Sequence, residues 1–388
     1  MNKPSVKPSR PFFSSGPTAK RAGWNINILK DSLVSRSHRS KEGKESLKKA
    51  IELSKKLAAI PDNYLVGIMP ASDTGAFECA LWSLLGTKGV TALVWESFGA
   101  GWTTDINKEL KLNAHVIKSE YGQIPDLSSI DWSNDVVFTW NGTTSGVKVP
   151  SGKFIPDNRQ GLSLCDATSA VFGMDIDWEK LDVVTYSWQK VLGGEAGFGI
   201  LVLSPRAVER IEQYDPSWPM PKIFRLKKKG KINKGIFEGE TINTPSMICV
   251  HEYIDALEWG LSFEFNGAQG LQALIEKSTA NLAAIESWVA SKDWIDFLAT
   301  DKAIRSNTSV CLKIVAPWFT KIDTEAQTAF CKKISTILSA EQVAYDISSY
   351  RDAPPGFRFW AGPTVDSEDL MAALAWLEWA YEENLDSK

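Results

Sequence analysis

The sequence lacks the features that mark membrane, secreted, metal-binding or nucleic-acid-binding proteins. Its five cysteines are scattered and include no C-x-x-C pair, so we expect buried free thiols in a reducing cytosol and no metal site. No stretch approaches the roughly 18 uninterrupted apolar residues of a membrane span. The first ten residues have no apolar core like that of a signal peptide. A net charge of −4 argues against a nucleic-acid partner. These absences predict a cytoplasmic protein.

The composition is that of a globular protein with more than one domain. The 388 residues are 44% hydrophobic and 23% charged. From about 64 to 205, apolar strands alternate with helices, which predicts an α/β domain with a mostly parallel, doubly wound sheet. From about 265, the pattern predicts a smaller α+β domain with helices at 268–290, 323–339 and 367–381 and strands at 309–314, 343–348 and 357–361. We therefore divide the chain into a mobile N-terminal arm (1–20), a large domain (21–262) and a small domain (263–388).

One lysine stands at an unusual place between two apolar runs. Residues 182–203 contain an apolar run that ends near Lys190, a cluster of glycines from 193 to 199, and a second apolar run. This pattern predicts a strand, a turn and a returning strand. A lysine buried at the end of a strand loses hydration, which lowers its pKa and makes its amine nucleophilic. A surface turn with a solvated lysine is the alternative that this stretch alone leaves open.

An aspartate 24 positions upstream of Lys190 favours the buried interpretation. Asp166 closes the apolar run 162–165. Lysine and aspartate are the two groups that a pyridoxal phosphate enzyme requires. The lysine holds the cofactor aldehyde as an imine, and the aspartate keeps the pyridine nitrogen protonated.

Other polar and aromatic residues follow the predicted strands. The turn 70–75 leads into a helix, where backbone N–H groups favour an anion. Thr74 adds a hydroxyl there, and we expect Asp73 to cap the helix with its side chain. Trp102, framed by glycines, is suited to stack on a planar ring, and Thr143 lies in a hydroxyl-rich turn. Each has a plain structural alternative, a turn or a core side chain. In a doubly wound sheet all of them meet at one crevice.

Two cationic features complete the candidate site. Arg36, His38 and Arg39 form a compact cluster suited to a phosphate or carboxylate, although a solvated loop is the simpler interpretation. Arg358 stands inside the aromatic stretch 356–362, where an unpaired guanidinium is unfavourable and a substrate carboxylate is a natural partner. A nicotinamide-binding fold fits poorly, because no G-x-G-x-x-G opens a helix after a strand.

In order and spacing, these features resemble the phosphoserine aminotransferases, class V members of the fold-type I pyridoxal phosphate enzymes. The resemblance spans essentially the whole chain and rests on Ser37–Lys41, the anion turn, Trp102, Asn141–Gly146, Asp166, Gln189-Lys190 and Asn243-Thr244-Pro245.

The resemblance implies a role for each of these residues. Lys190 would bind the cofactor covalently and shuttle the proton between Cα and C4′, Asp166 would pair with the pyridinium nitrogen, Trp102 would stack on the ring, and Thr143 would bind near the ring hydroxyl. The cofactor phosphate would be held by Asp73, Thr74, Gln189 and, across a homodimer with shared active sites, by Asn243 and Thr244.

The implied substrates are glutamate and 3-phosphohydroxypyruvate. His38 and Arg39 would meet their distal phosphate or γ-carboxylate, and Arg358 would bind the α-carboxylate. Better-known bacterial members carry arginine at the position of Thr74, so this chain differs in how substrate phosphate is held, and Arg36 or the basic loop 225–231 is a candidate replacement. Some members also serve pyridoxine synthesis.

We weigh three alternative functions for the same sequence. An alanine-glyoxylate or serine-pyruvate aminotransferase would share the fold without needing the distal cationic pair. A cysteine desulfurase would need a cysteine on a mobile loop, whereas Cys311 and Cys331 fall in a predicted strand and a predicted helix. A pyridoxal phosphate-binding protein without catalysis is the alternative from a different class.

Overall fold

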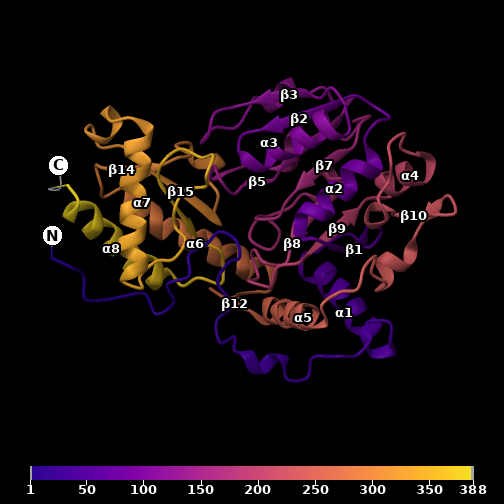
Figure 1. The fold of residues 1–388 in the computed structure, drawn as a ribbon, viewed down its shortest axis with the longest axis horizontal. Coiled ribbons are helices and arrows are strands. Elements are labelled where there is room, and N and C mark those ends of the chain that lie inside the picture. Colours follow the sequence, from indigo (N-terminus) through magenta and orange to yellow (C-terminus); the bar gives the residue numbers. More distant parts are fainter. Residues whose placement is uncertain (1, 386–388) are drawn as a thin grey trace.

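The computed structural model describes residues 2–385 and confirms the predicted α/β architecture. A large part contains a seven-stranded sheet with helices on both faces, and a smaller C-terminal part packs beside it (Figure 1). The sheet has the order β1-β9-β8-β7-β4-β2-β3. Its strands are β1 (Leu65–Pro70), β2 (Val90–Val94), β3 (His115–Lys118), β4 (Asp135–Thr139), β7 (Ser163–Asp166), β8 (Val183–Ser187) and β9 (Phe198–Leu203).

The sheet is mostly parallel, with a single reversed strand. β9 pairs antiparallel with both β1 and β8, while the pairs among β2, β3, β4, β7 and β8 are parallel. The strand, turn and returning strand predicted around Lys190 are therefore β8 and β9. β8 brings the chain to the ligand-binding edge of the sheet, and β9 carries it back.

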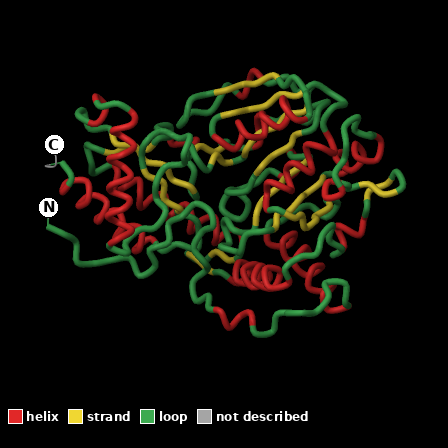
Figure 2. Tube along the Cα trace, in the orientation of Figure 1, coloured by secondary structure: helices red, strands yellow, loops and turns green. Residues whose placement is uncertain are grey.

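The central strands are apolar along their whole length because both faces of the sheet are covered. In β9, Ile200 and Val202 belong to one hydrophobic core, whereas Leu201 and Leu203 belong to the other. Helices α2 (Ser72–Leu84) and α4 (Pro205–Gln213) cover the second core, and α1 (Lys41–Leu57) and α5 (Met247–Ser262) cover the first. Figure 2 shows helices on either side of the strands of the large sheet. Helix α3 (Ser97–Thr104) follows β2 and contributes Trp102 to the second core.

Short elements fill the connections between these helices and strands. Two-residue strand pairs are β5 (Asn141–Gly142) with β6 (Val147–Lys148), β10 (Lys227–Lys228) with β11 (Lys231–Ile232), and β12 (Glu264–Phe265) with β13 (Ala268–Gln269). Single 3-10 turns lie at Ile26–Leu29, Leu127–Ser129, Gly152–Phe154, Trp178–Lys180, Lys222–Phe224, Lys234–Glu238, Lys302–Ile304 and Phe319–Lys321, and a π turn extends α3 over Asp105–Glu109.

The C-terminal part is the predicted α+β unit with one strand moved. Its antiparallel sheet β14-β15-β16 consists of Ile295–Phe297, Ser309–Ile314 and Phe357–Trp360, packed by α6 (Leu271–Val289), α7 (Thr324–Ala340) and α8 (Ser367–Glu383). The strand predicted at 343–348 is wrong, because this stretch makes only isolated bridges through Tyr345 and Ser348. Its apolar residues instead fill the core beneath α7 as coil.

The N-terminal segment is fixed to the C-terminal part, contrary to the mobile arm expected for it. The Ser9 backbone N–H donates to Asp369 Oδ1 at 2.7 Å, and the Trp360 N–H donates to the Phe13 carbonyl at 2.9 Å. The two ends of the described chain consequently lie near each other (Figure 1). Within residues 2–385, no helix combines the length and apolar character needed to cross a bilayer.

Candidate active site

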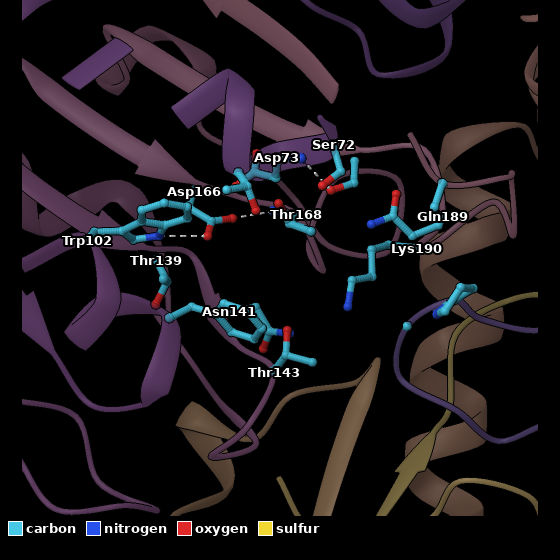
Figure 3. Close-up of a pocket in the computed structure, with 16 residues that line it drawn as sticks. Ser72, Asp73, Trp102, Thr139, Asn141, Thr143, Asp166, Thr168, Gln189 and Lys190 are labelled. Atoms are coloured by element: carbon cyan, nitrogen blue, oxygen red, sulfur yellow. Dashed lines mark hydrogen bonds between the residues drawn. The ribbon is translucent and has the colours of Figure 1, made fainter. Parts of the chain in front are cut away.

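A cavity of about 230 Å³ opens where the carboxyl ends of β1, β4, β7 and β8 meet (Figure 3). Seven residues proposed from the sequence line it together: Asp73, Thr74, Trp102, Thr143, Asp166, Gln189 and Lys190. They come from segments far apart in the chain. The parallel sheet collects them, as expected for the switch points of such folds.

Lys190 lies on the turn after β8 and is only 8% exposed. Burial lowers the pKa of its ammonium to about 8, helped by the positive charge of Arg358 and opposed by the charges of Asp166, Glu96 and Asp73. Its Nζ donates a hydrogen bond to the Ser15 carbonyl. A substantial fraction of this amine is therefore neutral near physiological pH, which is the nucleophilic form.

The turn that presents Lys190 depends on one glycine and on the N-terminal segment. Gly193 donates its N–H to the Lys190 carbonyl at 2.9 Å and has a φ of +68°. A Cβ there would lie 2.2 Å from the Ala19 carbonyl oxygen, so a larger residue would displace the backbone. Thr18 fastens the other side, because its hydroxyl donates to the Lys190 carbonyl and its N–H donates to the Gln189 carbonyl at 3.0 Å.

Asp166 ends β7 and faces the cavity with two hydrogen bonds of its own. Its Oδ2 accepts from Trp102 Nε1 at 3.1 Å, and its Oδ1 accepts from the Thr168 N–H at 3.0 Å. Both donors stabilise the ionised carboxylate and fix its orientation. Trp102 is held from behind by Phe77, with ring centroids 4.9 Å apart.

Asp73 differs from its predicted role as a helix cap. Ala71 occupies the N-cap of α2 without a side-chain hydrogen bond, and within the described chain neither Asp73 carboxyl oxygen has a hydrogen-bond partner. Its backbone N–H donates to Ser187 Oγ at 3.0 Å. Complete burial, followed by the charge of Asp166, raises the pKa of the Asp73 carboxyl well above its usual range, with the nearby Thr185 and Thr168 hydroxyls acting in the opposite direction.

A network of hydroxyls and an amide fixes the wall opposite α2. Thr143 Oγ1 donates to Ser169 Oγ at 2.8 Å, and Asn141 Nδ2 donates to the same oxygen at 2.8 Å. Ser309 Oγ donates to the Thr143 carbonyl at 2.7 Å, which ties this wall to β15. The network leaves the Thr143 side chain in one orientation at the edge of the cavity.

Sequence reasoning gave no individual role to nine of the lining residues, although two of them, Ser72 and Asn141, lie in stretches that it singled out: Gly16, Pro17, Ser72, Phe98, Thr139, Asn141, Thr168, Ser187 and Ala196. Thr139 and Ser187 are the last residues of β4 and β8, so their place at strand ends was a usable signal. Gly16 and Pro17 carried no such signal, because their approach depends on the packing of the N-terminal segment.

Five proposed residues do not line this cavity: His38, Arg39, Asn243, Thr244 and Arg358. Arg358 lies close by on β16, since its charge acts on the Lys190 amine, and its buried Nε lacks a partner among residues 2–385.

The other four precede the two helices of the opposite face. His38 and Arg39 lie just before α1, and burial, then the Arg39 charge, lowers the pKa of the His38 imidazole. Asn243 and the exposed Thr244 lie just before α5. One chain alone therefore leaves these four residues outside its own site.

Comparisons with known proteins agree with this geometry. Residues 100–296 match the family described as aminotransferase class-V. The chain is 56% identical over 380 residues to a phosphoserine aminotransferase of Methanosarcina barkeri, covering 98% of this chain and 99% of the relative, and 55% identical over 381 residues to that of Methanosarcina mazei, with the same coverage. Its fold resembles the crystal structure of a phosphoserine aminotransferase from Cytophaga hutchinsonii, with a TM-score of 0.79, 21% identity and coverage of 95% and 98% of the two chains.

Proposed function

This chain belongs to the class V aminotransferases and, within them, to the phosphoserine aminotransferases, and from that membership we propose how its residues divide the work. The reaction transfers the amino group of glutamate to 3-phosphohydroxypyruvate, giving 2-oxoglutarate and phosphoserine for serine biosynthesis. The enzyme depends on pyridoxal phosphate. The observation that carries the assignment of roles is the convergence of Lys190 and Asp166 on one cavity.

The cavity has the donor set that pyridoxal phosphate requires. Lys190 offers a largely desolvated amine for the cofactor aldehyde, and Asp166 offers an oriented carboxylate for the pyridine nitrogen. Polar atoms around the cavity remain without partners in the described chain, including Gln189 Oε1 and Asn141 Oδ1. When bound, the cofactor supplies an electron sink that acidifies the substrate Cα–H.

We assign the proton transfers to Lys190. With its amine free, Lys190 would be the base that acts on the substrate Cα–H, and its lowered pKa suits it to accept a proton near neutral pH. The same amine would carry that proton between Cα and C4′. Trp102 would stack on the ring and Thr143 would bind near its hydroxyl, and both side chains are buried, which excludes water.

The substrate carboxylates need cations, and Arg358 is a candidate because its charge acts on the Lys190 amine. We propose that Arg358 binds the α-carboxylate, because its buried Nε has no partner in the part of the chain described here. We propose that His38 and Arg39 bind the distal phosphate or γ-carboxylate. Thr74 lines the cavity and would add only a hydroxyl. Arg36 is held by Glu42 at 2.9 Å, so it is a weaker candidate for this task.

We propose that the active enzyme is a cytoplasmic homodimer with shared active sites. The support is geometric: His38, Arg39, Asn243 and Thr244 do not line the cavity of their own chain, so a second subunit would bring them to it. Asn243 and Thr244 would bind the cofactor phosphate together with Asp73, Thr74 and Gln189 of the other chain. The five free cysteines suit a reducing compartment. We also retain the arm (1–20), large domain (21–262) and small domain (263–388) as the proposed division.

The assigned roles are tested by spectroscopy on the loaded enzyme. Addition of glutamate should convert the visible absorption of the bound cofactor, and subsequent addition of 3-phosphohydroxypyruvate should restore it. Borohydride treatment followed by peptide mapping should place the cofactor on Lys190, and Lys190→Ala should lose both absorption and turnover. A label on any other lysine would overturn the assignment, and alanine outperforming glutamate would favour an alanine-glyoxylate aminotransferase.

Subunit mixing tests the shared sites. Lys190→Ala and Asn243→Ala place their defects in different subunits of each proposed site, so a mixed dimer regains one complete site. We expect two poorly active variants to recover activity when they are unfolded and refolded together. The control is Lys190→Ala mixed with Asp166→Asn, which share a chain and should not recover. No gain in the first mixture would contradict the shared site.

A further inference from the structure

Two buried carboxyl groups face each other at the floor of the cavity (Figure 3). Asp73 stands in the first turn of α2 and Asp166 at the end of β7, and they are 5% and 7% exposed. Two adjacent carboxylates in a buried site repel strongly, so such a pair ordinarily retains one proton between them.

The hydrogen bonds around the pair are unequal. Asp166 accepts one from the Trp102 indole and one from the Thr168 backbone, and both favour its ionised form. No hydrogen bond of ordinary geometry reaches the Asp73 carboxyl oxygens from a described residue, and the nearby Thr185 and Thr168 hydroxyls favour its ionised form less than burial and the Asp166 charge oppose it. A negative charge is therefore stable on Asp166 and poorly supported on Asp73.

The charged groups near Asp73 and Asp166 do not remove this difference between the two carboxyl groups. The charged groups that act on the pair from the packed elements are Lys190, after β8, and Glu96, before α3. Lys190 donates to the Ser15 carbonyl rather than to either aspartate. From β8, Asp73 meets only the neutral hydroxyls of Thr185 and Ser187. Burial and the Asp166 charge both raise the pKa of the Asp73 carboxyl.

We propose that Asp73 is a positioning residue that stays protonated and donates its proton in a hydrogen bond to the Asp166 carboxylate. The pair then carries a single negative charge, located on Asp166. No bond is made or broken, and the proton remains on Asp73 through the reaction.

This arrangement has two effects on the cofactor, and both rest on the proposed function. A hydrogen bond from Asp73 would hold the Asp166 carboxylate in one orientation, and the single negative charge of the pair would stabilise the protonated ring nitrogen. A neutral Asp73 also adds no charge at the N-terminus of α2, where the cofactor phosphate would lie. An aspartate at this position is therefore compatible with a phosphate beside it.

The protonation state is tested first on the cofactor-free protein. At neutral pH, the infrared difference between wild type and Asp73→Asn should contain the carbonyl stretch of a protonated carboxylic acid. Asp73→Ala should remove the same band, so the protonation state can still be measured if one of the two variants does not fold. A band with the frequencies of an ionised carboxylate would overturn the proposal.

Stability against pH gives an independent measurement. The unfolded chain releases the Asp73 proton near pH 4, whereas the folded chain keeps it, so wild-type stability falls as pH rises above that value. Asp73→Asn should therefore gain on wild type by up to about tenfold in the folding equilibrium constant per pH unit as the pH rises from about 4 towards the raised pKa of Asp73. The control Asp135→Asn, which loses an ion pair with Arg210 at 3.0 Å, should instead lose stability at neutral pH. A pH-independent difference for Asp73→Asn would refute the proposal.

Cofactor binding tests the positioning role. Asparagine keeps a neutral donor, so Asp73→Asn should bind pyridoxal phosphate within about threefold of wild type, whereas Asp73→Ala should bind at least about tenfold more weakly. Equal weakening by both variants would overturn the role of the donated hydrogen bond. Failure of wild type to bind the cofactor would instead contradict the proposed function and leave the infrared and stability results standing.

Discussion

Replacing Lys190 by methionine should abolish catalysis and make the cofactor-free protein more stable. The pKa of the buried amine is lowered from 10.5 to about 8, chiefly by burial. This difference corresponds to roughly 3 kcal/mol of destabilisation when the amine is charged. Methionine has a similar length and no charge, so it removes this cost, although it also loses the hydrogen bond to the Ser15 carbonyl, worth about 1 kcal/mol.

The direction of the pH dependence is fixed by the lowered pKa. Above about pH 10.5 the amine is neutral in both the folded and the unfolded chain, so its charge costs nothing. As the pH falls towards 8, the unfolded chain takes up the proton first, and wild type loses stability. Below pH 8 the cost is complete. The advantage of Lys190→Met should therefore be about 2 kcal/mol at pH 7, vanish near pH 10 and reverse above it, where only the lost hydrogen bond counts.

Thermal unfolding of the cofactor-free proteins measures this difference. For a chain of 388 residues, 2 kcal/mol corresponds to a rise in Tm of roughly 2 to 3 °C. Lys118→Met is the matched control, because Lys118 is exposed on β3 and its replacement should change the Tm only slightly. A Lys190→Met protein less stable than wild type at pH 7 would refute the reasoning, since the buried ammonium would then be well stabilised.

Three further changes test the surroundings of the site. The free energy of unfolding of Glu96→Gln should rise by about 3 kcal/mol relative to wild type between pH 4.5 and 7. Burial raises the pKa of Glu96 to about 7, so wild type loses stability as the pH rises through that interval. Urea unfolding measures this difference, and a difference that stays constant with pH would contradict the prediction. Gly193→Ala should destabilise the fold by roughly 2 kcal/mol more than Gly230→Ala. Both glycines have positive φ, but an added Cβ would meet the Ala19 carbonyl at Gly193 and nothing within 4 Å at Gly230. Equal losses of Tm would show that the backbone relaxes away from Ala19. Arg358→Gln should raise the KM for glutamate and for the keto acid about 100-fold and leave the affinity for the cofactor unchanged. A variant that loses only cofactor affinity would argue against a role of Arg358 in carboxylate binding.

Much of the fold was predictable because the central strands are buried on both faces. The strand at Ser309–Ile314 was located to the residue, and long helices such as α8 differed from prediction only at their ends. The strand expected at 343–348 was wrong, since a short apolar run describes buried coil and buried strand equally well. Residues Ile295–Phe297 were missed because three residues carry too little periodicity.

The site was predictable where chemistry coincides with a strand end. Lys190, Asp166 and Thr143 were each proposed from their position after an apolar run, and the parallel sheet brings them together. The orientation of Asp73 was not predictable, since its local sequence suggested a helix cap. Only the packing of α2 against β7 and β8 reveals that its carboxyl faces Asp166.

The N-terminal segment has a consequence for the order in which the protein is made. Ser9 binds Asp369, 360 residues later in the chain, while Ser15 and Thr18 hold the turn of Lys190. The N-terminal segment leaves the ribosome long before α8 is synthesised. A nascent chain can therefore form its large sheet while Lys190 still lacks these contacts. The amine should acquire its final surroundings only when synthesis of the last helix is finished. Immature chains would accordingly capture the cofactor poorly.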